Sequence, residues 1–405
     1  MRVAVVGSGP AGGYAANALL QHRNVEVDVY DRSHAPHGLI RYGVAPDHQE
    51  TKRIADVFPF ARARLHLGVE VGKHSSHDEL LEFHHAVIYA TGAEVDNRLN
   101  IPGEGLPGSH SAREFVAWYN GDPEHAGREF DLSTERAVII GNGNVALDVA
   151  RILTTDPEQL ASTDIADPAL AALRASRIRE VVVLGRRGVD HAAYSTAEFL
   201  ALVDRADIDV VVDADELASP GRAGQPDAAG QDSPLARLRL DIVREAAARK
   251  PTGADRRIIF RYLASPVEIL GDGRVTGVRI VRNEVSVDGD GVARARPAGV
   301  YGTIDAGLVL GSVGYRGSAI AGLPFDDGTG VMPNVAGRIV DPRTHDEIPG
   351  AYAAGWIKRG ARGVIGSNKV CANETVESLL ADYLTGRLET PSPPSPTFCV
   401  RPAKG

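Results

Sequence analysis

The chain has 405 residues, of which 43% are hydrophobic and 24% are charged, and its formal net charge is −9 at pH 7. This length predicts two or three domains, and the composition is typical of globular proteins. The acidic net charge argues against a nucleic-acid partner. No apolar run approaches the roughly 20 residues that a membrane span needs. Because strand-like residues begin at Arg2, we also expect no targeting peptide, no membrane association and a cytoplasmic location.

The sequence contains two cysteines, Cys371 and Cys399, and neither belongs to a C-x-x-C pair. This argues against disulfide scaffolds, Cys-type zinc sites and Cys-ligated iron–sulfur clusters. A turn at residues 288–291, Asp-Gly-Asp-Gly, lacks the spacing and the final Glu of a calcium loop. We therefore expect no metal centre.

The first block of predicted elements extends to about Pro107. The strand "RVAVVG" leads through a glycine-rich turn into a helix, and "VEVDVY" forms the next strand, which ends at Asp31. Residues 69–72 and 86–93 also have strand-like patterns. The Gly- and Pro-rich residues 101–108 indicate a crossing between domains.

The second block repeats this order of elements. It has a strand "RAVIIG", a helix over residues 144–153 and a strand "EVVVLGRRG". Patterning then predicts helices near 168–176 and over 235–249, antiparallel strands over 257–287, a strand and small-residue turn over 306–317, and a last helix over 373–383. Composition predicts a flexible loop at 217–234 and a disordered Pro-rich tail.

The glycine-rich turn of the first block, Gly7-Ser8-Gly9-Pro10-Ala11-Gly12, fits G-x-G-x-x-G between a strand and a helix. In this motif, which we call the first cradle, Gly7 permits the tight turn, Gly9 lets a pyrophosphate approach, and Gly12 lets the helix pack close to the strand. Asp31 ends the next strand about 20 residues later, where an acid takes the ribose hydroxyls. The alternative is a tight turn without a ligand, but the complete pattern favours a dinucleotide.

The corresponding turn of the second block, Gly141-Asn142-Gly143-Asn144-Val145-Ala146, has Ala at the third position, which the motif allows. We call it the second cradle. Its next strand ends in Gly185-Arg186-Arg187-Gly188 rather than in an acid. Because guanidinium groups bind a 2′-phosphate that an acid would repel, this pattern predicts NADP(H) rather than NAD(H). An exposed basic turn is the alternative interpretation.

One chain with two dinucleotide sites is suited to passing reducing equivalents between cofactors. The acid-ended first cradle suits FAD, whose adenosine ribose has no 2′-phosphate. Longer segments add to these motifs, notably "GLIRYGVAPDH", "GNGNVALDVARILTTDP", "SVGYRG", "LPFDD" and "GWIKRG…GVIG". From Arg2 to about Leu384 the sequence resembles the adrenodoxin-reductase-like ferredoxin–NADP reductases.

This resemblance implies an α/β fold with two Rossmann-like dinucleotide-binding domains of the glutathione-reductase type. The FAD domain would comprise residues 1–106 and 312–388, with an NADP domain, 107–311, inserted, and 389–405 as the tail. The resemblance also implies that NADPH gives a hydride to the flavin, which passes single electrons to a ferredoxin. We expect an acidic ferredoxin as partner and a monomeric enzyme.

The resemblance assigns site residues as well. With the first cradle, the implied FAD contacts are Ala11, Asp31, Leu39, Val71, Trp356, Gly363, Val364 and Ile365. The implied NADP contacts are Gly143, Asn144, Val145, Ala146, Arg186, Arg187, Glu198 and Gly363. His48, Trp356 and Gly363 would lie near the flavin and the nicotinamide, where we assign His48 an electrostatic and positioning role. The alternatives are a surface histidine at His48 and a core tryptophan at Trp356.

The sequence departs from the family pattern at several of these places. Asp31 stands where the family usually has Glu, and His37 replaces a bulky residue before Gly38. "RGARG" replaces R-G-P-T-G, so that Ala361 and Arg362 stand near the flavin, and a family glutamate is replaced by Ala201. These changes bear on flavin tuning and on the rate of hydride transfer more than on which cofactors bind.

Three rival functions remain open at this stage. A disulfide reductase of the same fold would need a cysteine pair beside the flavin, which the sequence lacks. An NADPH oxidase or quinone reductase would need no protein partner, and a non-catalytic NADP sensor would need no intact flavin site. The stretch 237–261 holds eight Arg and Lys residues against three acids. It is either a docking face for an acidic partner or a solvated helix face.

Overall fold

The computed structural model describes residues 1–58, 60–217, 234–287 and 293–392. Most of the predicted loop at 217–234, the turn at 288–291, and residues 393–405 of the predicted tail, with Cys399, lie outside these residues. The first residues of the tail, 389–392, are described, and the N–H of Ser392 donates to the carbonyl oxygen of Glu82 at 2.9 Å. The chain divides into two compact units. Unit 1 consists of Met1–Val44, His48–Asn97 and Gly314–Gly405, and unit 2 of Ala45–Asp47 and Arg98–Val313. The assignment of FAD and NADP domains to particular residues stays a prediction.

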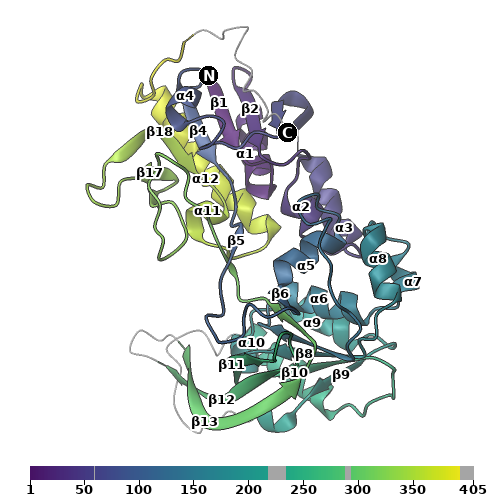
Figure 1. The fold of residues 1–405 in the computed structure, drawn as a ribbon. Coiled ribbons are helices and arrows are strands. Elements are labelled where there is room, and N and C mark those ends of the chain that lie inside the picture. Colours follow the sequence, from purple (N-terminus) through teal and green to yellow (C-terminus); the bar gives the residue numbers. More distant parts are fainter. Residues whose placement is uncertain (59, 218–233, 288–292, 393–405) are drawn as a thin grey trace. The chain divides into compact units, whose positions relative to one another are not determined.

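Unit 1 is built on a seven-stranded sheet with the strand order β16-β17-β18-β4-β1-β2-β3. Neighbouring strands from β18 to β3 pair in parallel, and β17 and β16 add an antiparallel edge. In Figure 1 the strands from the start of the chain lie beside the yellow-green β18, which comes from its end. The strands are β1 (Arg2–Val6), β2 (Glu26–Asp31), β3 (Arg64–Leu67), β4 (Ala86–Tyr89), β16 (Asn334–Val335), β17 (Arg338–Val340) and β18 (Glu347–Ala353).

Both faces of this sheet are buried, because alternate residues of β1 pack into different clusters. Val3 and Val5 pack with the helices α1 and α12, while Ala4 and Val6 pack with Leu80 of α4 and Ile357 of α11. Continuous apolar strands of this kind are typical of parallel sheets covered on both faces. The helices and turns of unit 1 are α1 (Pro10–Leu20), α2 (Leu39–Tyr42), α3 (Gln49–Lys52), η1 (Arg53–Val57), η2 (Phe60–Arg62), α4 (His77–Leu81), α11 (Trp356–Arg359) and α12 (Ile365–Leu384). A two-stranded ribbon pairs β5 (Val95–Asp96) with β15 (Tyr315–Arg316).

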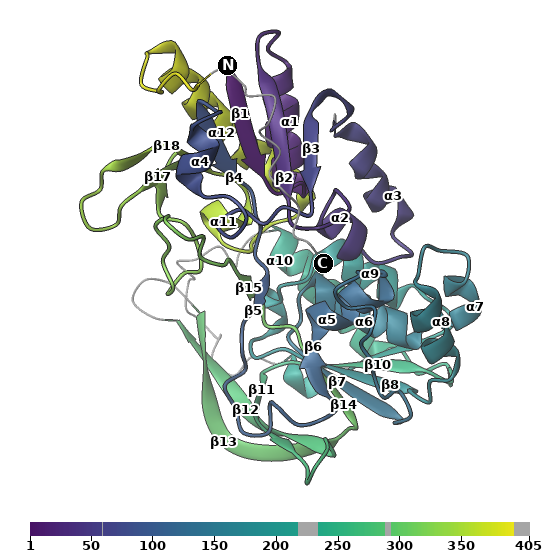
Figure 2. The same cartoon turned by 45° about the horizontal axis from the view of Figure 1, so that its top comes forward.

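Unit 2 is built on a six-stranded parallel sheet with the order β6-β14-β7-β8-β10-β9. Figure 2 labels β6, β14, β7, β8 and β10 of this sheet. These strands are β6 (Ser109–Ser111), β7 (Arg136–Ile140), β8 (Glu180–Leu184), β9 (Asp209–Val212), β10 (Arg257–Arg261) and β14 (Leu308–Gly311). A separate antiparallel sheet contains β11 (Ala264–Leu270), β12 (Gly277–Val287) and β13 (Ala293–Asp305).

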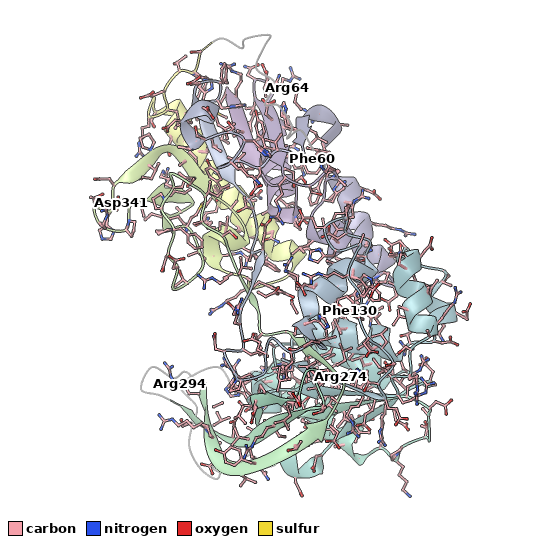
Figure 3. All side chains as sticks on the ribbon, in the orientation of Figure 1. Phe60, Arg64, Phe130, Arg274, Arg294 and Asp341 are labelled. Carbon is pink, nitrogen blue, oxygen red and sulfur yellow. The ribbon has the colours of Figure 1, made fainter. Side chains whose placement is uncertain are left out.

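The two faces of the six-stranded sheet have different covers. Ala137 and Ile139 of β7 pack in a cluster with the helices, which includes the aromatic group around Phe130 labelled in Figure 3. Val138 and Ile140 pack instead against residues of β11 and β12. The antiparallel sheet is therefore the cover of one face. The helices and turns of unit 2 are α5 (Ala112–Tyr119), α6 (Asn144–Thr154), α7 (Pro157–Leu160), α8 (Asp167–Arg174), η3 (Val189–His191), α9 (Thr196–Val203), η4 (Ala214–Glu216) and α10 (Pro234–Ala248).

Three predicted elements need correction. Residues 69–72 do not form a strand: Gly68 has a positive φ of 72°, so the chain turns there, and the edge strand is β3. Residues 257–261 form β10, which pairs in parallel with β8 and β9, so only the strands after it are antiparallel. The last helix begins at Ile365, not near residue 373. Among the described helices, none is long and apolar enough to cross a membrane.

Candidate functional site

The three glycines of the first cradle have the three different environments that a dinucleotide requires. Gly7 has a φ of 105°, and a Cβ there would lie 2.5 Å from the carbonyl oxygen of Ala90. A Cβ on Gly12 would lie 1.8 Å from the carbonyl oxygen of Gly7, so the helix can approach the strand only with glycine there. A Cβ on Gly9 would meet nothing within 4 Å. The turn is therefore closed where the backbone packs and open where a pyrophosphate would lie.

The first cradle ends in the N-terminus of α1, which begins with Pro10 after Gly9 as its N-cap. No side chain caps this end, so its free N–H groups and the positive end of the helix dipole suit an anion. The Asp31 carboxylate accepts hydrogen bonds from Ser8 N–H at 2.7 Å, from Ser8 Oγ at 2.5 Å and from Ser33 N–H at 2.8 Å. Asp31 thus holds the cradle in shape, and since a carboxylate offers about four acceptor positions, one remains for a ribose hydroxyl.

The segment around His37 packs against the first cradle. The His37 N–H donates to the carbonyl oxygen of Ser8 at 3.2 Å. A Cβ on Gly38 would lie 3.2 Å from Cα of Gly9, which brings the start of α2 next to the open side of the cradle. Leu39, the first residue of α2, exposes 41% of its surface. An apolar side chain is thus left uncovered beside the cradle, and its contact with FAD stays a prediction.

The C-terminal part of unit 1 reaches the same cradle. Gly355 has a φ of 77°, and its Cβ would lie 2.4 Å from the Cβ of Ala11, so only glycine permits this approach. Trp356 follows directly, stacks against Tyr315 with ring centroids 6.3 Å apart, and donates its indole N–H to the carbonyl oxygen of Arg362 at 3.1 Å. The predicted contacts Gly363, Val364 and Ile365 form the N-terminal end of α12, where Val364 exposes 64% of its surface.

The structure also shows where two further predicted site residues of unit 1 lie, Val71 and His48. Val71 is buried in the core and forms an isolated bridge with Ser75. His48 is the half-buried residue that precedes α3. Their contacts with FAD and with the nicotinamide stay predictions.

The second cradle has the same construction in unit 2. Gly141 has a φ of 117°, and its Cβ would lie 2.0 Å from the carbonyl oxygen of Ser312. Gly143 is the N-cap of α6, and its Cβ would only touch Ala193 at 4.0 Å. Val145 is half-buried and Ala146 fully buried in the first turns of α6. The open position is again the second glycine, which fits a pyrophosphate at a helix N-terminus.

Asn144 makes a hydrogen bond that the glycine motif does not predict. Its Oδ1 accepts a hydrogen bond from the N–H of Ser195 at 2.7 Å, and Ser195 is the N-cap of α9. The two helix N-termini are thereby tied together. Glu198 lies in the first turn of α9, close enough for its charge to raise the pKa of the half-buried Asp148 carboxyl on α6, in addition to the larger effect of desolvation.

The two arginines after β8 are available for an anion. Arg186 is exposed and Arg187 half-buried, and neither guanidinium group makes a hydrogen bond or ion pair with a described residue. Burial and the adjacent charge of Arg186 lower the pKa of Arg187, and the charge of Asp190 opposes this in part. Two neighbouring cations whose guanidinium groups bond to no described carboxylate are the expected arrangement for a phosphate site.

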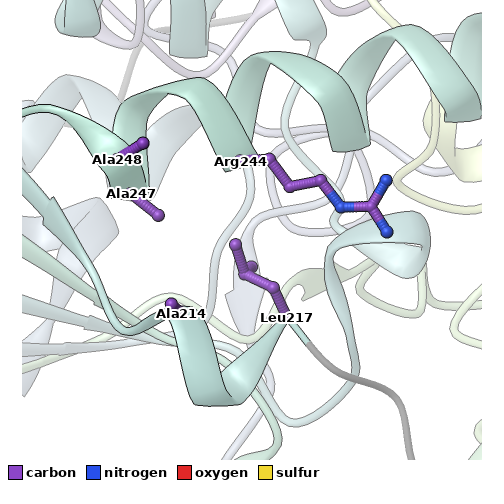
Figure 4. Close-up of a pocket in the computed structure, with 5 residues that line it drawn as sticks. All are labelled: Ala214, Leu217, Arg244, Ala247 and Ala248. Atoms are coloured by element: carbon purple, nitrogen blue, oxygen red, sulfur yellow. The ribbon is translucent and has the colours of Figure 1, made fainter.

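The arginine-rich stretch 237–261 serves mainly to hold unit 2 together. Arg239 donates to the carbonyl oxygen of Ala192 at 2.8 Å, and Arg249 donates to that of Val203 at 2.8 Å. Three others bind backbone carbonyl groups or buried carboxylates: Arg256, Arg257 and Arg261. Figure 4 shows Arg244 on α10 beside a pocket of about 310 Å³ that η4 also lines. These contacts favour a structural interpretation of most of this stretch.

Sequence reasoning missed three residues that shape these sites: Ser8, Ser195 and Asn283. Ser8 lies at a variable position of the glycine motif, so the motif does not single it out, and its bonds with Asp31 are seen only in the structure. The Asn283 amide donates to the carbonyl oxygen of Arg186 at 2.8 Å, across 97 residues of sequence, and no local pattern indicates it.

Residues 1–187 match the family model described as pyridine nucleotide-disulphide oxidoreductase. With a dinucleotide cradle in each unit, the fold is that of a two-cradle pyridine-nucleotide oxidoreductase. The chain is 48% identical, over 96% of its length, to a probable ferredoxin/ferredoxin–NADP reductase of Mycobacterium tuberculosis. It spans 66% of that relative, which is just under two thirds. It is also 40% identical to the mitochondrial NADPH:adrenodoxin oxidoreductase of Homo sapiens, over 98% of this chain and 82% of the human protein.

A solved structure of Mycobacterium tuberculosis FprA in complex with NADPH is similar throughout, with a TM-score of 0.88 and 44% identity. The match covers 96% of this chain and 86% of that one. The chain therefore belongs to the adrenodoxin-reductase-like family of ferredoxin–NADP reductases. The predicted family and the predicted fold class are both confirmed.

Proposed function

We propose that this protein is an FAD-dependent NADPH:ferredoxin oxidoreductase. The observation that carries the proposal is the pair of cradles on one chain, one ending in Asp31 and the other in Arg186 and Arg187. The first suits a nucleotide with a free ribose 2′-hydroxyl, and the second suits one with a 2′-phosphate. The names of the relatives, which mention NADPH, ferredoxin and adrenodoxin, support the same activity.

In unit 1, we propose that the first cradle and the N-terminus of α1 hold the pyrophosphate of FAD, with Asp31 at the ribose. The exposed apolar groups Leu39 and Val364, together with Trp356, would exclude water from the flavin. Bound FAD supplies the conversion of a two-electron hydride donor into single-electron steps. The chain itself then has to bind and orient two nucleotides and one protein partner.

In unit 2, we propose that Gly143, Asn144, Val145 and Ala146 receive the NADP pyrophosphate while Arg186 and Arg187 bind its 2′-phosphate. Glu198, His48 and Gly363 would orient the nicotinamide, as the family resemblance implies. Hydride transfer itself needs no strong acid or base from the protein.

The proposed acceptor is an acidic iron–sulfur protein of the ferredoxin type. Because the chain carries a net charge of −9, such a partner requires a local basic surface. Lys358 pairs with Glu374 at 2.6 Å, and Arg359 bonds to Ser367 and Asn368, whereas Arg362 is exposed. We propose Arg362 as a docking cation, along with a cytoplasmic location and a monomeric state.

Two alternative functions differ from this proposal in one measurable property each. An NADPH oxidase or quinone reductase would give the same flavin reduction but no response to ferredoxin. A non-catalytic NADP sensor would bind NADPH without flavin reduction. Among the described residues the only cysteine is the buried Cys371, whose sulfur accepts the N–H of Gly355 at 3.2 Å, which does not favour disulfide chemistry.

Cytochrome c reduction, driven by NADPH with and without added ferredoxin, tests the proposal. We expect ferredoxin to raise the rate strongly, and we expect the effect to weaken with salt because acidic and basic surfaces attract. A rate independent of ferredoxin would favour the quinone reductase alternative.

A further inference from the structure

Hydrogen bonds on three successive carbonyl groups hold the turn that carries the two arginines. The carbonyl oxygen of Gly185 accepts from the N–H of Ala264 at 3.0 Å, and that of Arg187 accepts from the N–H of Leu263 at 3.3 Å. Between them, the carbonyl oxygen of Arg186 accepts from Nδ2 of Asn283 at 2.8 Å. The first two bonds join backbone to backbone. Only the third depends on the identity of a side chain.

Asn283 comes from the antiparallel sheet that covers this face of unit 2. It lies on β12 directly after an irregularity in the pairing with β13, between Val281 and Asn283, and its own N–H donates to the carbonyl oxygen of Leu263 at 2.6 Å. The irregularity turns the side chain toward the arginine turn rather than along the regular face of the sheet. Asn283 thereby bonds to the turn through its side chain, and through its backbone it bonds to Leu263, whose own N–H donates to the turn at Arg187.

The surroundings of Asn283 fix the orientation of its amide. Nδ2 donates to the Arg186 carbonyl oxygen and also to Oγ of Ser265 at 2.7 Å, so both of its hydrogens are used. A flipped amide would point an oxygen at the Arg186 carbonyl, which cannot donate. Oδ1 is buried and has no hydrogen-bond partner among the described residues, and only 2% of Asn283 is exposed. A buried acceptor without a hydrogen-bond partner opposes folding. The stabilisation that the Asn283 amide provides therefore comes from the hydrogen bonds that Nδ2 donates, one of which holds the turn.

Arg186 and Arg187 need such support because they are adjacent cations that repel each other. Neither guanidinium group is held by a hydrogen bond or ion pair with a described residue. Their directions therefore follow from the backbone of the turn. A backbone that can relax would let the two charges separate, and a phosphate would then have to bring them together again.

We propose that Asn283 is a positioning residue for NADPH selectivity, because its amide fixes the turn that presents Arg186 and Arg187 to a 2′-phosphate. This inference rests on the proposed function, which assigns the 2′-phosphate to those two arginines. Asn283 would not touch the nucleotide. Its effect would appear in discrimination between NADPH and NADH rather than in the turnover of bound NADPH.

The test is calorimetric titration of the holoenzyme with 2′,5′-ADP and with 5′-AMP, which differ by the 2′-phosphate alone. Asn283→Leu removes the donor without adding charge, and we expect 2′,5′-ADP to bind about tenfold more weakly while 5′-AMP changes by less than about twofold. The KM for NADPH should rise by a similar factor at unchanged kcat. If both ligands weaken equally, or if neither does, the inference is wrong. If the leucine does not fold, Asn283→Ala takes its place in the same titrations.

Glu284→Gln is the matched control, since Glu284 is the exposed neighbour on the same strand. It should leave both titrations unchanged. Arg186→Ala combined with Arg187→Ala distinguishes a failure of the proposed 2′-phosphate site from a failure of the inference about Asn283. If this double variant binds 2′,5′-ADP as the parent does, the proposed 2′-phosphate site is wrong and the inference is wrong with it. If the double variant binds weakly but Asn283→Leu binds normally, only the inference is overturned.

Discussion

Replacing Gly9 by valine should remove FAD from unit 1 and leave the polypeptide folded. Gly9 has φ −70° and ψ −172°, an extended conformation that a β-branched residue adopts readily, and its Cβ would meet no atom within 4 Å. The apoprotein should therefore lose no stability. It should gain about 0.4–1 kcal/mol, because valine restricts the unfolded chain more than glycine does.

The loss should appear only when FAD is present. A cofactor at 100 to 1,000 times its Kd stabilises the folded state by roughly 2.7–4.1 kcal/mol, and the variant should forgo this stabilisation because the valine methyl groups occupy the space for the pyrophosphate. The assay is flavin absorbance of the purified protein, together with thermal unfolding with and without added FAD.

Gly12→Ala is the control variant, because it should destabilise the folded protein itself rather than remove FAD alone. A Cβ at Gly12 would lie 1.8 Å from the carbonyl oxygen of Gly7, so this variant should be destabilised even without FAD. A Gly9→Val protein that retains its full flavin content would refute the assignment of the first cradle. A Gly9→Val apoprotein that unfolds as readily as Gly12→Ala would refute the structural reasoning.

Three other perturbations test separate parts of the account. Arg186→Ala with Arg187→Ala should raise the KM for NADPH by on the order of 10–10²-fold per arginine and leave NADH nearly unchanged in steady-state assays; equal losses would contradict the assignment. Ala201→Glu restores the family glutamate on the exposed side of α9 and should change the hydride-transfer rate in stopped-flow measurements at constant flavin content. An unchanged rate would show that alanine at this position does not affect hydride transfer. Burial alone would raise the pKa of Asp28, but hydrogen bonds from Arg64 (Figure 3), His66 and His84 outweigh it and hold the pKa far below its ordinary value. The resulting stability is present above the unfolded-state pKa of about 3.9 and lost as the pH falls, so denaturant unfolding of Asp28→Asn should depend less on pH below about 5 than unfolding of the parent.

The cradles were predictable because their glycine spacing encodes local backbone geometry. Gly7 and Gly141 adopt positive φ angles of 105° and 117°, which nearly any other residue would resist. The strands before them are continuous apolar runs. The helix α6 after the second cradle has a clear apolar periodicity, whereas α1 after the first is formed mostly of small or apolar buried residues, so each cradle could be recognised from a short stretch of sequence. Trp356 could be identified only through the family resemblance, because its Ala- and Gly-rich surroundings are also typical of a core.

The incorrect and missing predictions concern features that depend on contacts between distant parts of the chain. Val69 and Val71 alternate with Glu70 as a strand would, but Gly68 turns the chain, and the edge position beside β2 is taken by residues whose Arg64 pairs with Asp28. The strand β10 has a pattern that suits either direction of pairing. The bond from Asn283 to Arg186 joins two sheets across 97 residues, and no window of local sequence contains both.

The most direct test of the central claim is a stopped-flow measurement of flavin absorbance. The purified yellow protein is mixed with NADPH or with NADH, and oxidised ferredoxin is then added under anaerobic conditions. We predict rapid bleaching by NADPH, much slower bleaching by NADH, and return of the flavin absorbance when ferredoxin arrives. A protein without flavin, equal bleaching by the two nucleotides, or a reduced flavin that ferredoxin does not reoxidise would contradict the account.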